Sequence, residues 1–196
     1  KYINRLAGLY ESFAEPVLSS IAQITCKVMS HSDKGKSLTQ RSLAWMKEHK
    51  IAFSKEINQT TYSKVKKVLS KGMKAGDSPL KLANKLADLP EFDWPRARMT
   101  ARTEMTAAAN AGTLEGWRQS DVVHHKQWMC AGGRRSRDSH KKADGQIVPL
   151  EEPFKVGNCE LLFPGDSSLG AGPEEICNCR CTMRGITDYK MQSNYH

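Results

Sequence analysis

The sequence has little of what marks several specialised protein classes. It contains no run of about 18 or more apolar residues, so we expect no transmembrane helix and no membrane partner. No signal peptide is recognisable. Six cysteines in 196 residues are too few for a disulfide-dense secreted domain. Aromatic residues make up only 7% of the chain, but a hydrophobic content of 39% is enough for one proper core.

Signatures of common active sites are also missing. The chain has no glycine-rich phosphate loop, no nucleophile elbow and no HExxH pair. His140, with Asp138 or Asp144 nearby, is the remaining candidate for acid–base chemistry, although such a histidine is more often a hydrogen-bonded structural residue. We therefore expect neither an enzyme nor a small-molecule substrate. The alternative is a nuclease or toxin-like hydrolase that uses His140 and Asp144.

Acidic residues are in deficit. Lys and Arg number 30 against 21 Asp and Glu, which gives a formal charge of +9 and a pI near 9.3. Such a balance favours acidic partners, nucleic acid among them. Four lysines share one face of a predicted helix, opposite its apolar face. They form either a solvated face or candidate nucleic-acid contacts: Lys64, Lys67, Lys71 and Lys74.

Helical patterns cover the first 120 residues, and a glycine- and proline-rich texture with short apolar stretches follows. We predict an α+β fold, in which an N-terminal helical arm or bundle precedes a small glycine- and cysteine-rich α+β module. The expected divisions are an N-terminal helical segment (1–58), a further helical part (59–120), the small module (121–186) and a tail without a fused toxin module (187–196).

Several helix ends can be predicted from local signals. A helix runs through Leu43 and Met46, and a helical hairpin follows it. Gly76 ends the first helix of the hairpin, while Ser78 caps the second and Pro79 occupies its first turn. The longest helix runs to Ser120, and its many small residues suit close packing against neighbouring helices.

Five of the six cysteines lie after residue 129, and three of them alternate in "CNCRC". If this segment is extended, Cys177, Cys179 and Cys181 point to one face. With His140 they would form a candidate zinc site. Further possible ligands are Cys130, Cys159, His124 and His125. Packed reduced thiols, or a disulfide between Cys159 and the cluster, are the alternatives. Cys26 lies in an apolar helical context and is expected to be a buried thiol.

An ordered set of short motifs resembles a known family. The segments "RARMTARTEMTAAANAGTLEGW", "KQWMCAGGRRSRDSHKKADGQIVPLEEPF", "LLFPGDSS" and "CNCRC" occur in one order over about residues 60 to 185. This set is similar to the phage head morphogenesis domain of Mu F-like minor head proteins. Two departures stand out: Gly133 and Arg134 occupy positions where the family usually has acidic residues, and Cys177 is an extra thiol.

The resemblance implies a set of structural motif residues, matched position by position. They are Arg102, Thr103 and Glu104 in "ARTE"; Trp128; His140, Asp144 and Gly145 in "SHxxxDG"; Phe154; Pro164, Gly165 and Asp166 in "PGD"; and Cys179 and Cys181 in "NCRC".

The same resemblance implies a role. Members are minor structural proteins of tailed-phage and prophage heads that lie inside the capsid near the portal. The expected partners are the portal protein, other head proteins and double-stranded DNA, with head assembly, DNA packaging or DNA ejection as the process. The expected location is the virion, after assembly in the host cytoplasm. A zinc-stapled nucleic-acid-binding protein is a further alternative. We expect Arg102 and Glu104 to reach from the long helix into the C-terminal module.

Overall fold

The structure is a computed structural model, and it describes residues 38–49, 59–120 and 122–187. Helices and short strands follow one another along these residues. In chain order they are α2 (Leu38–Glu48), α3 (Gln59–Lys74), α4 (Pro79–Ala87), α5 (Trp94–Ser120), β1 (His125–Met129), α6 (Asp138–Ala143), β2 (Ile147–Pro149), β3 (Phe154–Val156), β4 (Cys159–Leu161), α7 (Pro173–Ile176) and β5 (Thr182–Ile186).

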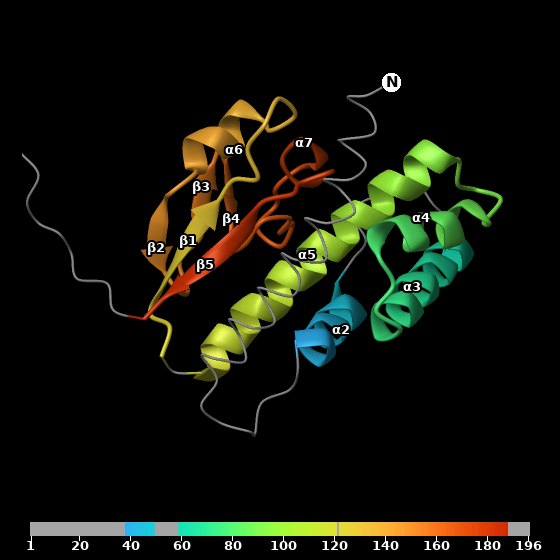
Figure 1. The fold of residues 1–196 in the computed structure, drawn as a ribbon, viewed down its shortest axis with the longest axis horizontal. Helices are drawn as coiled ribbons and strands as arrows, with labels where there is room; N and C mark the ends of the chain where they lie inside the picture. The colour runs from blue at the N-terminus through green and yellow to red at the C-terminus, as the bar shows by residue number, and fades with distance from the viewer. Residues whose placement is uncertain (1–37, 50–58, 121, 188–196) are drawn as a thin grey trace, which may run out of the picture.

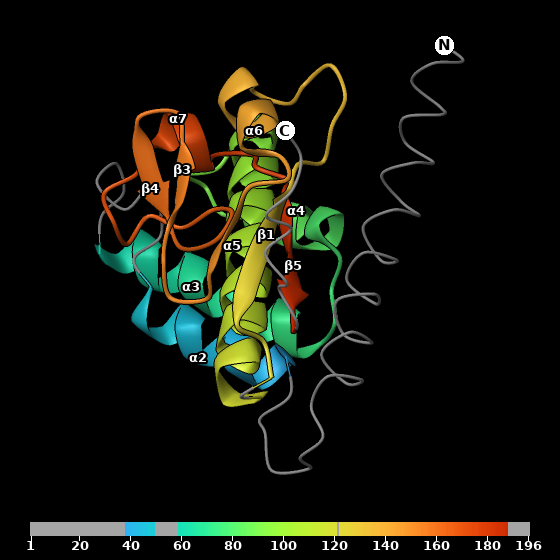
Figure 2. The same cartoon turned by 90° about the vertical axis from the view of Figure 1, so that its left-hand side faces the viewer.

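Helix α5 is the spine of the molecule. Helices α2, α3 and α4 lie along one side of it, while the strands, α6 and α7 lie along the other (Figure 1). In the view at right angles, β1 is seen in front of α5 (Figure 2). Because α5 has 27 residues at about 1.5 Å each, it spans roughly 40 Å and contacts both groups.

The predicted helical hairpin is confirmed. Gly76 adopts a φ of +67° just after α3, where a left-handed residue stops a helix readily. The Ser78 side chain accepts a hydrogen bond from the Lys81 N–H at 3.3 Å, and Pro79 begins α4. The buried face of α3 includes Val65 and Leu69.

Small residues allow α5 to approach its neighbours closely, as predicted. A Cβ placed on Gly116 would lie 2.7 Å from an Arg41 guanidinium nitrogen. Arg41 in turn donates from Nε to the Gly112 carbonyl at 3.0 Å. Helix α2 is therefore fixed to α5 by the buried Arg41, whose side chain lies against the glycine backbone of α5.

Two antiparallel sheets make up the C-terminal module. The larger has the order β2–β1–β5, with Trp128 of β1 opposite Met183 of β5. The smaller is the hairpin of β3 and β4, with Phe154 opposite Leu161. Helix α6 packs against β3.

The described core has two apolar clusters that share α5. One lies among α2–α5 and includes Met46, Leu69, Leu82 and Leu86. The other lies between α5 and the module, and it contains Trp128 and Phe154 together with three cysteines. Trp45 packs against both clusters.

The α+β fold class is confirmed, but the extended strand considered for the segment of the three alternating thiols is not found. The final strand begins at Thr182, so residues 177–181 precede it rather than forming it. The predictions for residues 1–37, including Cys26, and for the tail at 188–196 fall outside the described residues. None of the helices in the described ranges is long and apolar enough to cross a membrane.

Candidate functional site

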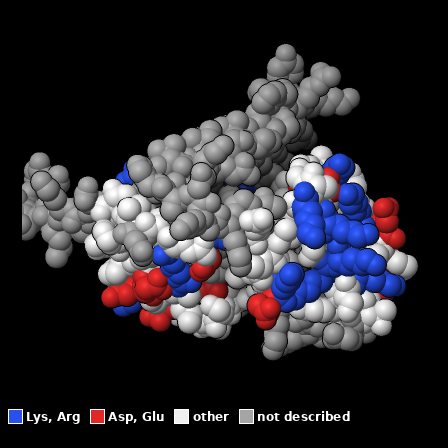
Figure 3. Space-filling view, turned by 90° about the horizontal axis from the view of Figure 1, so that it is seen from below, with Lys and Arg blue, Asp and Glu red and all other residues white. Residues whose placement is uncertain are grey.

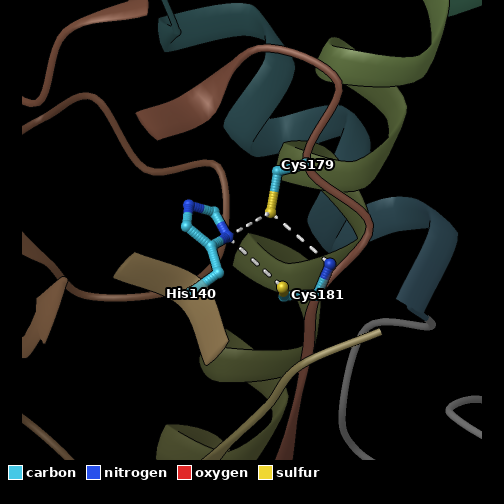
Figure 4. A group of neighbouring side chains, drawn as sticks. All are labelled: His140, Cys179 and Cys181. Carbon is cyan, nitrogen blue, oxygen red and sulfur yellow. Dashed lines mark hydrogen bonds between the residues drawn. The ribbon is translucent and has the colours of Figure 1, made fainter. Parts of the chain in front are cut away.

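His140, Cys179 and Cys181 meet in the interior of the C-terminal module. The Nδ1 atom of His140 lies 3.4 Å from the Cys181 Sγ and 3.7 Å from the Cys179 Sγ. Figure 4 shows the three side chains pointing toward one another. All three residues are buried, His140 with 2% of its surface exposed. Helix α6 supplies the histidine, and the segment between α7 and β5 supplies the thiols.

The other ring nitrogen of His140 is held by a carboxylate. His140 Nε2 lies 3.0 Å from Glu175 Oε2, and the Ser139 hydroxyl donates to the same oxygen at 2.8 Å. The fully buried Trp128 packs edge-on against the imidazole, with ring centroids 5.5 Å apart. The imidazole of His140 is therefore held both by its hydrogen-bond partners and by its contact with the Trp128 ring.

The two thiols differ in their pKa values. The hydrogen bond from Cys181 lowers the pKa of the Cys179 thiol, because the bond stabilises a thiolate there. The same bond, together with burial, raises the pKa of Cys181 well above its usual range. The Cys181 N–H also points at the Cys179 sulfur, at 3.4 Å. Cys179 is therefore the more readily ionised of the pair.

Cys177 is not part of this group, contrary to the predicted ligand set. It caps the C-terminus of α7, and Asn178 follows with a left-handed φ of 54°. That turn breaks the extended alternation that would have aligned three thiols. Among the described residues, the group whose potential ligand atoms all lie within 4.8 Å of one another is His140, Cys179 and Cys181. The five described cysteines form no disulfide.

Helix α5 holds the segments on either side of the thiols. The Asn110 side chain donates from Nδ2 to the carbonyls of Pro164 and Cys181, at 3.0 and 3.2 Å, and accepts from the Thr182 hydroxyl at 3.3 Å. About two turns earlier, the Thr103 hydroxyl accepts from the Asn178 N–H at 2.9 Å. We refer to Thr103 and Asn110 together as the α5 clamp.

The "PGD" turn is shaped by two requirements. Gly165 has a φ of +90°, and a Cβ placed there would lie 3.1 Å from the Ala107 Cβ of α5. The buried Asp166 carboxylate accepts from the N–H groups of Leu162 and Ser168, at 2.9 and 2.8 Å. Glycine is needed for both conformation and contact, while the aspartate satisfies the turn's own backbone.

The "ARTE" residues are all buried in α5. Glu104, expected to reach the C-terminal module, lies instead with Oε2 3.1 Å from His49 Nε2, at the end of α2. His49 stacks on Trp45 with ring centroids 3.9 Å apart. Arg102 is 8% exposed. Thr103 ties α5 to the thiol segment through its hydrogen bond with Asn178.

The "SHxxxDG" segment does not bring Asp144 to the imidazole. The exposed Asp144 accepts from the Cys130 N–H at 2.7 Å, and Gly145 follows with a φ of +78°. Asp144 therefore ties the end of α6 to the end of β1. Asp138 pairs with Lys141 at 3.0 Å. The carboxylate that partners His140 is Glu175.

The predicted lysine stripe is exposed. Lys64, Lys67, Lys71 and Lys74 all lie on the solvent-facing side of α3. Lys81 and Lys85 of α4 are also exposed and pair with the buried Asp77, the first at 2.6 Å. Figure 3 shows Lys and Arg gathered over the end of the molecule that α3 and α4 form.

Lys126 of β1 is a buried charge that sequence reasoning missed. The residue has no exposed surface, and its ammonium lies 5.2 Å from the centre of the Phe154 ring. Burial lowers the pKa of Lys126 to about 8, and the nearby Arg118 acts in the same direction. Within the described part of the chain, Lys126 Nζ makes no hydrogen bond.

Asn110 and Glu175 were also missed. Asn110 lies in an alanine-rich stretch of the predicted helix. An asparagine among such small residues was the only sign in the sequence that this position makes a specific hydrogen bond. Glu175 is one of two adjacent glutamates in the first turn of α7. Acidic residues are common at helix N-termini, so Glu175 did not stand out in the sequence. Only the fold brings Glu175 to His140, across 35 positions of sequence.

The sequence model of a phage protein family matches most of these elements. The model of the family described as Phage Mu protein F like protein matches residues 63–184. The chain belongs to this family. The match runs from α3 to β5, so it includes the lysine stripe, the α5 clamp and the His–Cys group.

Two curated relatives are 30% identical to the chain. One is an uncharacterized protein, YqbB, of Bacillus subtilis, which matches over 93% of this chain and 61% of its own length. The other is named minor head protein GP7 of Bacillus phage SPP1, and it matches over 64% of this chain and 41% of its own length. The chain thus spans less than two thirds of either relative.

A third relative has an enzymatic name. It is the NAD(+)–arginine ADP-ribosyltransferase EFV of Enterococcus faecalis, 25% identical over 60% of this chain and only 24% of its own length. Most of that protein therefore lies outside the matched segment. No solved structure matches the chain. Family membership and the likeness to a minor head protein support a structural role in the phage head.

Proposed function

We propose that the protein is a minor structural component of a tailed-phage or prophage head. It lies inside the capsid near the portal, assembles there with the portal and other head proteins, and contacts packaged double-stranded DNA without reading its sequence. It enters the virion from the host cytoplasm during assembly. Family membership and the likeness to minor head protein GP7 support the first part of this proposal.

The burial of His140 and its partners favours a structural role over a catalytic one. Each ring nitrogen of His140 is in contact with another buried or half-buried group, and the ring itself is 2% exposed. A general base must reach a substrate proton within about 3 Å, or through one water. The His140 ring, enclosed by Glu175, Trp128 and two thiols, offers no such approach.

Two surface hollows lie away from His140. One, of about 420 Å³, is lined by residues of α3 that include Lys64 and Lys67. Another, of about 400 Å³, lies between the end of α5 and β2. Neither includes His140. The hydrolase alternative also needs Asp144 beside His140, yet Asp144 is bonded to the Cys130 N–H. These positions favour a structural protein.

The lysine stripe supports contact with DNA. Its four side chains are exposed on one face of α3, and no acidic residue occurs within α3 itself. Lysines that neutralise phosphates release counterions, which gives affinity without sequence preference. A protein packed beside condensed DNA gains from such contacts. The formal charge of +9 acts in the same direction.

Deleting the gene from the phage or prophage genome that encodes it tests the role in the head. We expect purified wild-type heads to contain the protein by mass spectrometry, and heads from the deletion to be fewer or poorer in DNA. Complementation in trans should restore both. Heads of normal yield and DNA content that never contained the protein would overturn the proposal.

Changing Lys64, Lys67, Lys71 and Lys74 together to alanine tests the DNA contact. We expect weaker binding to unrelated duplexes and a salt dependence whose log–log slope falls by up to about 3 to 4, since each phosphate contact contributes about 0.9. The matched control removes four exposed basic residues of the other half: Arg134, Lys141, Lys142 and Lys155. Equal loss in both variants would indicate net charge alone and contradict a specific α3 surface.

A further inference from the structure

The spacing of the His140–Cys179–Cys181 group matches that of ligands around a tetrahedral metal ion. Tetrahedral zinc has Zn–S bonds of about 2.3 Å and Zn–N bonds of about 2.0 Å, which places sulfur and nitrogen ligand atoms about 3.5 Å apart. The observed separations from His140 Nδ1 are 3.4 Å to the Cys181 Sγ and 3.7 Å to the Cys179 Sγ. All three ligand atoms lie within 4.8 Å of one another.

The surroundings of His140 are those of a metal-binding histidine. A ligating imidazole usually donates its other N–H to a carboxylate, which fixes the tautomer and turns the lone pair toward the metal. Glu175 stands in that position, 3.0 Å from Nε2, and Ser139 holds the same carboxylate oxygen. With the proton on Nε2, the Nδ1 lone pair points at the two sulfurs (Figure 4).

The sulfurs also have the environment of ligating thiolates. The Cys181 N–H points at the Cys179 sulfur at 3.4 Å, and the Ala131 N–H bonds the Cys181 sulfur. Both sulfurs are soft ligands in a buried site, and with an imidazole they suit zinc rather than magnesium or calcium. We propose that His140 Nδ1 and the sulfurs of Cys179 and Cys181 bind one zinc ion, with Glu175 as the positioning residue.

Cys130 is our assignment for the fourth ligand. A closed structural site needs four ligands. Cys130 directly precedes Ala131, whose N–H already reaches the Cys181 sulfur, and its side chain is half-buried at the end of β1. Its own backbone N–H is held by Asp144 of the "SHxxxDG" segment. The ion would then join three parts of the module: the end of β1, helix α6 and the segment before β5.

Metal analysis of the full 196-residue chain, purified under reducing conditions, tests the site. We expect one zinc per chain by mass spectrometry. Cobalt(II) in place of zinc should give the thiolate-to-cobalt charge-transfer absorption. A chelator should lower the melting temperature, because a structural ion binds the folded chain and not the unfolded one. A chain that takes up neither metal, or that carries a Cys179–Cys181 disulfide by peptide mapping, would overturn the proposal.

Single substitutions separate the ligands from their neighbours. Cys179→Ser should abolish the cobalt band. Glu175→Gln keeps the shape of the side chain and should weaken zinc binding about 10- to 100-fold. The control Cys159→Ser, at a half-buried thiol of β4, should bind as the wild type does. An unchanged cobalt band in Cys179→Ser would overturn the ligand set.

Two further cysteine variants test the fourth position. Cys130→Ser should weaken zinc binding and alter the charge-transfer intensity, whereas Cys177→Ser should leave both unchanged, because Cys177 caps α7 ahead of the turn at Asn178. The reverse pattern would overturn the assignment of Cys130. Since these readouts are metal content and absorption, they are independent of whether the protein acts in a phage head.

Discussion

Both sides of α5 pack through apolar clusters, but the C-terminal side relies more on hydrogen bonds over long sequence distances. On one side, α2, α3 and α4 pack by apolar side chains such as Leu69 and Leu82, which have no exposed surface. On the other, the α5 clamp also holds the "PGD" turn and the thiol segment, through hydrogen bonds between single side chains and distant backbone groups. Apolar packing follows from a periodic pattern, whereas each hydrogen bond of the clamp depends on one side chain.

Leu69→Ala, on the helical side, should give the largest loss of stability. The side chain is fully buried between α3 and its neighbours, so we expect the free energy of unfolding to fall by about 3 to 4 kcal/mol, from lost burial plus a cavity. Urea unfolding followed by circular dichroism measures this change. Leu80→Ala, at a position 59% exposed, is the control and should change little. Equal losses would show that the helical side is not held by its core.

Asn110→Ala tests the clamp in the same way. It leaves the carbonyls of Pro164 and Cys181 buried without this donor, and unmet buried groups cost about 1 to 3 kcal/mol each. We expect a loss of about 3 kcal/mol in urea unfolding. Asn84→Ala, on the exposed face of α4, should stay within about 0.5 kcal/mol. A loss no greater than that of the control would remove Asn110 as a structural anchor.

Gly165→Ala separates backbone strain from helix contact. It should cost about 2 to 3 kcal/mol, because the φ of +90° disfavours a side chain and Ala107 blocks the new Cβ. Gly170→Ala has nearly the same φ, +88°, with nothing within 4 Å, so it reports the backbone contribution alone. Thermal melting of both variants gives the difference. Equal shifts would mean that the approach to Ala107 contributes nothing.

Lys126→Met should give the smallest change, a gain in stability of about 1 kcal/mol at pH 7. Removing the buried charge stabilises the fold, while losing the cation–π contact with Phe154 offsets part of that gain. The pKa of Lys126 is about 8 in the folded chain against an ordinary 10.5, so between these values the unfolded chain binds the extra proton. Wild-type stability should therefore rise with pH over that range relative to the variant. Urea unfolding at pH 7 and pH 10 checks both, with exposed Lys155→Met as the control. Parallel pH profiles would refute a buried ammonium.

The sequence sufficed for the helical side because its signals are local. Gly76, Ser78 and Pro79 mark helix ends by their own conformational preferences, and the lysines fall opposite Val65 and Leu69 at helical spacing. The family resemblance, in turn, pointed to His140, Cys179 and Cys181 as residues that belong together.

The partners within the site could not be predicted because they depend on the fold. Cys177 looked equivalent to its neighbours until Asn178 turned the chain with a φ of 54°. Asp144 looked like the natural carboxylate for His140, yet the end of α6 directs it to the Cys130 N–H, and Glu175 arrives from α7. Alternating spacing predicts a common face only while the backbone stays extended.

The reach of the α5 clamp has a consequence for the order of folding. Thr103 meets Asn178 across 75 positions of sequence, and Asn110 meets the Cys181 carbonyl across 71. Closing loops of that length costs chain entropy that local helical turns do not. On a ribosome, α5 is therefore complete long before its distant hydrogen-bond partners emerge. Until then Asn110 lacks these partners, so the hydrogen bonds of the clamp form only after the segment that follows α7 has been synthesised.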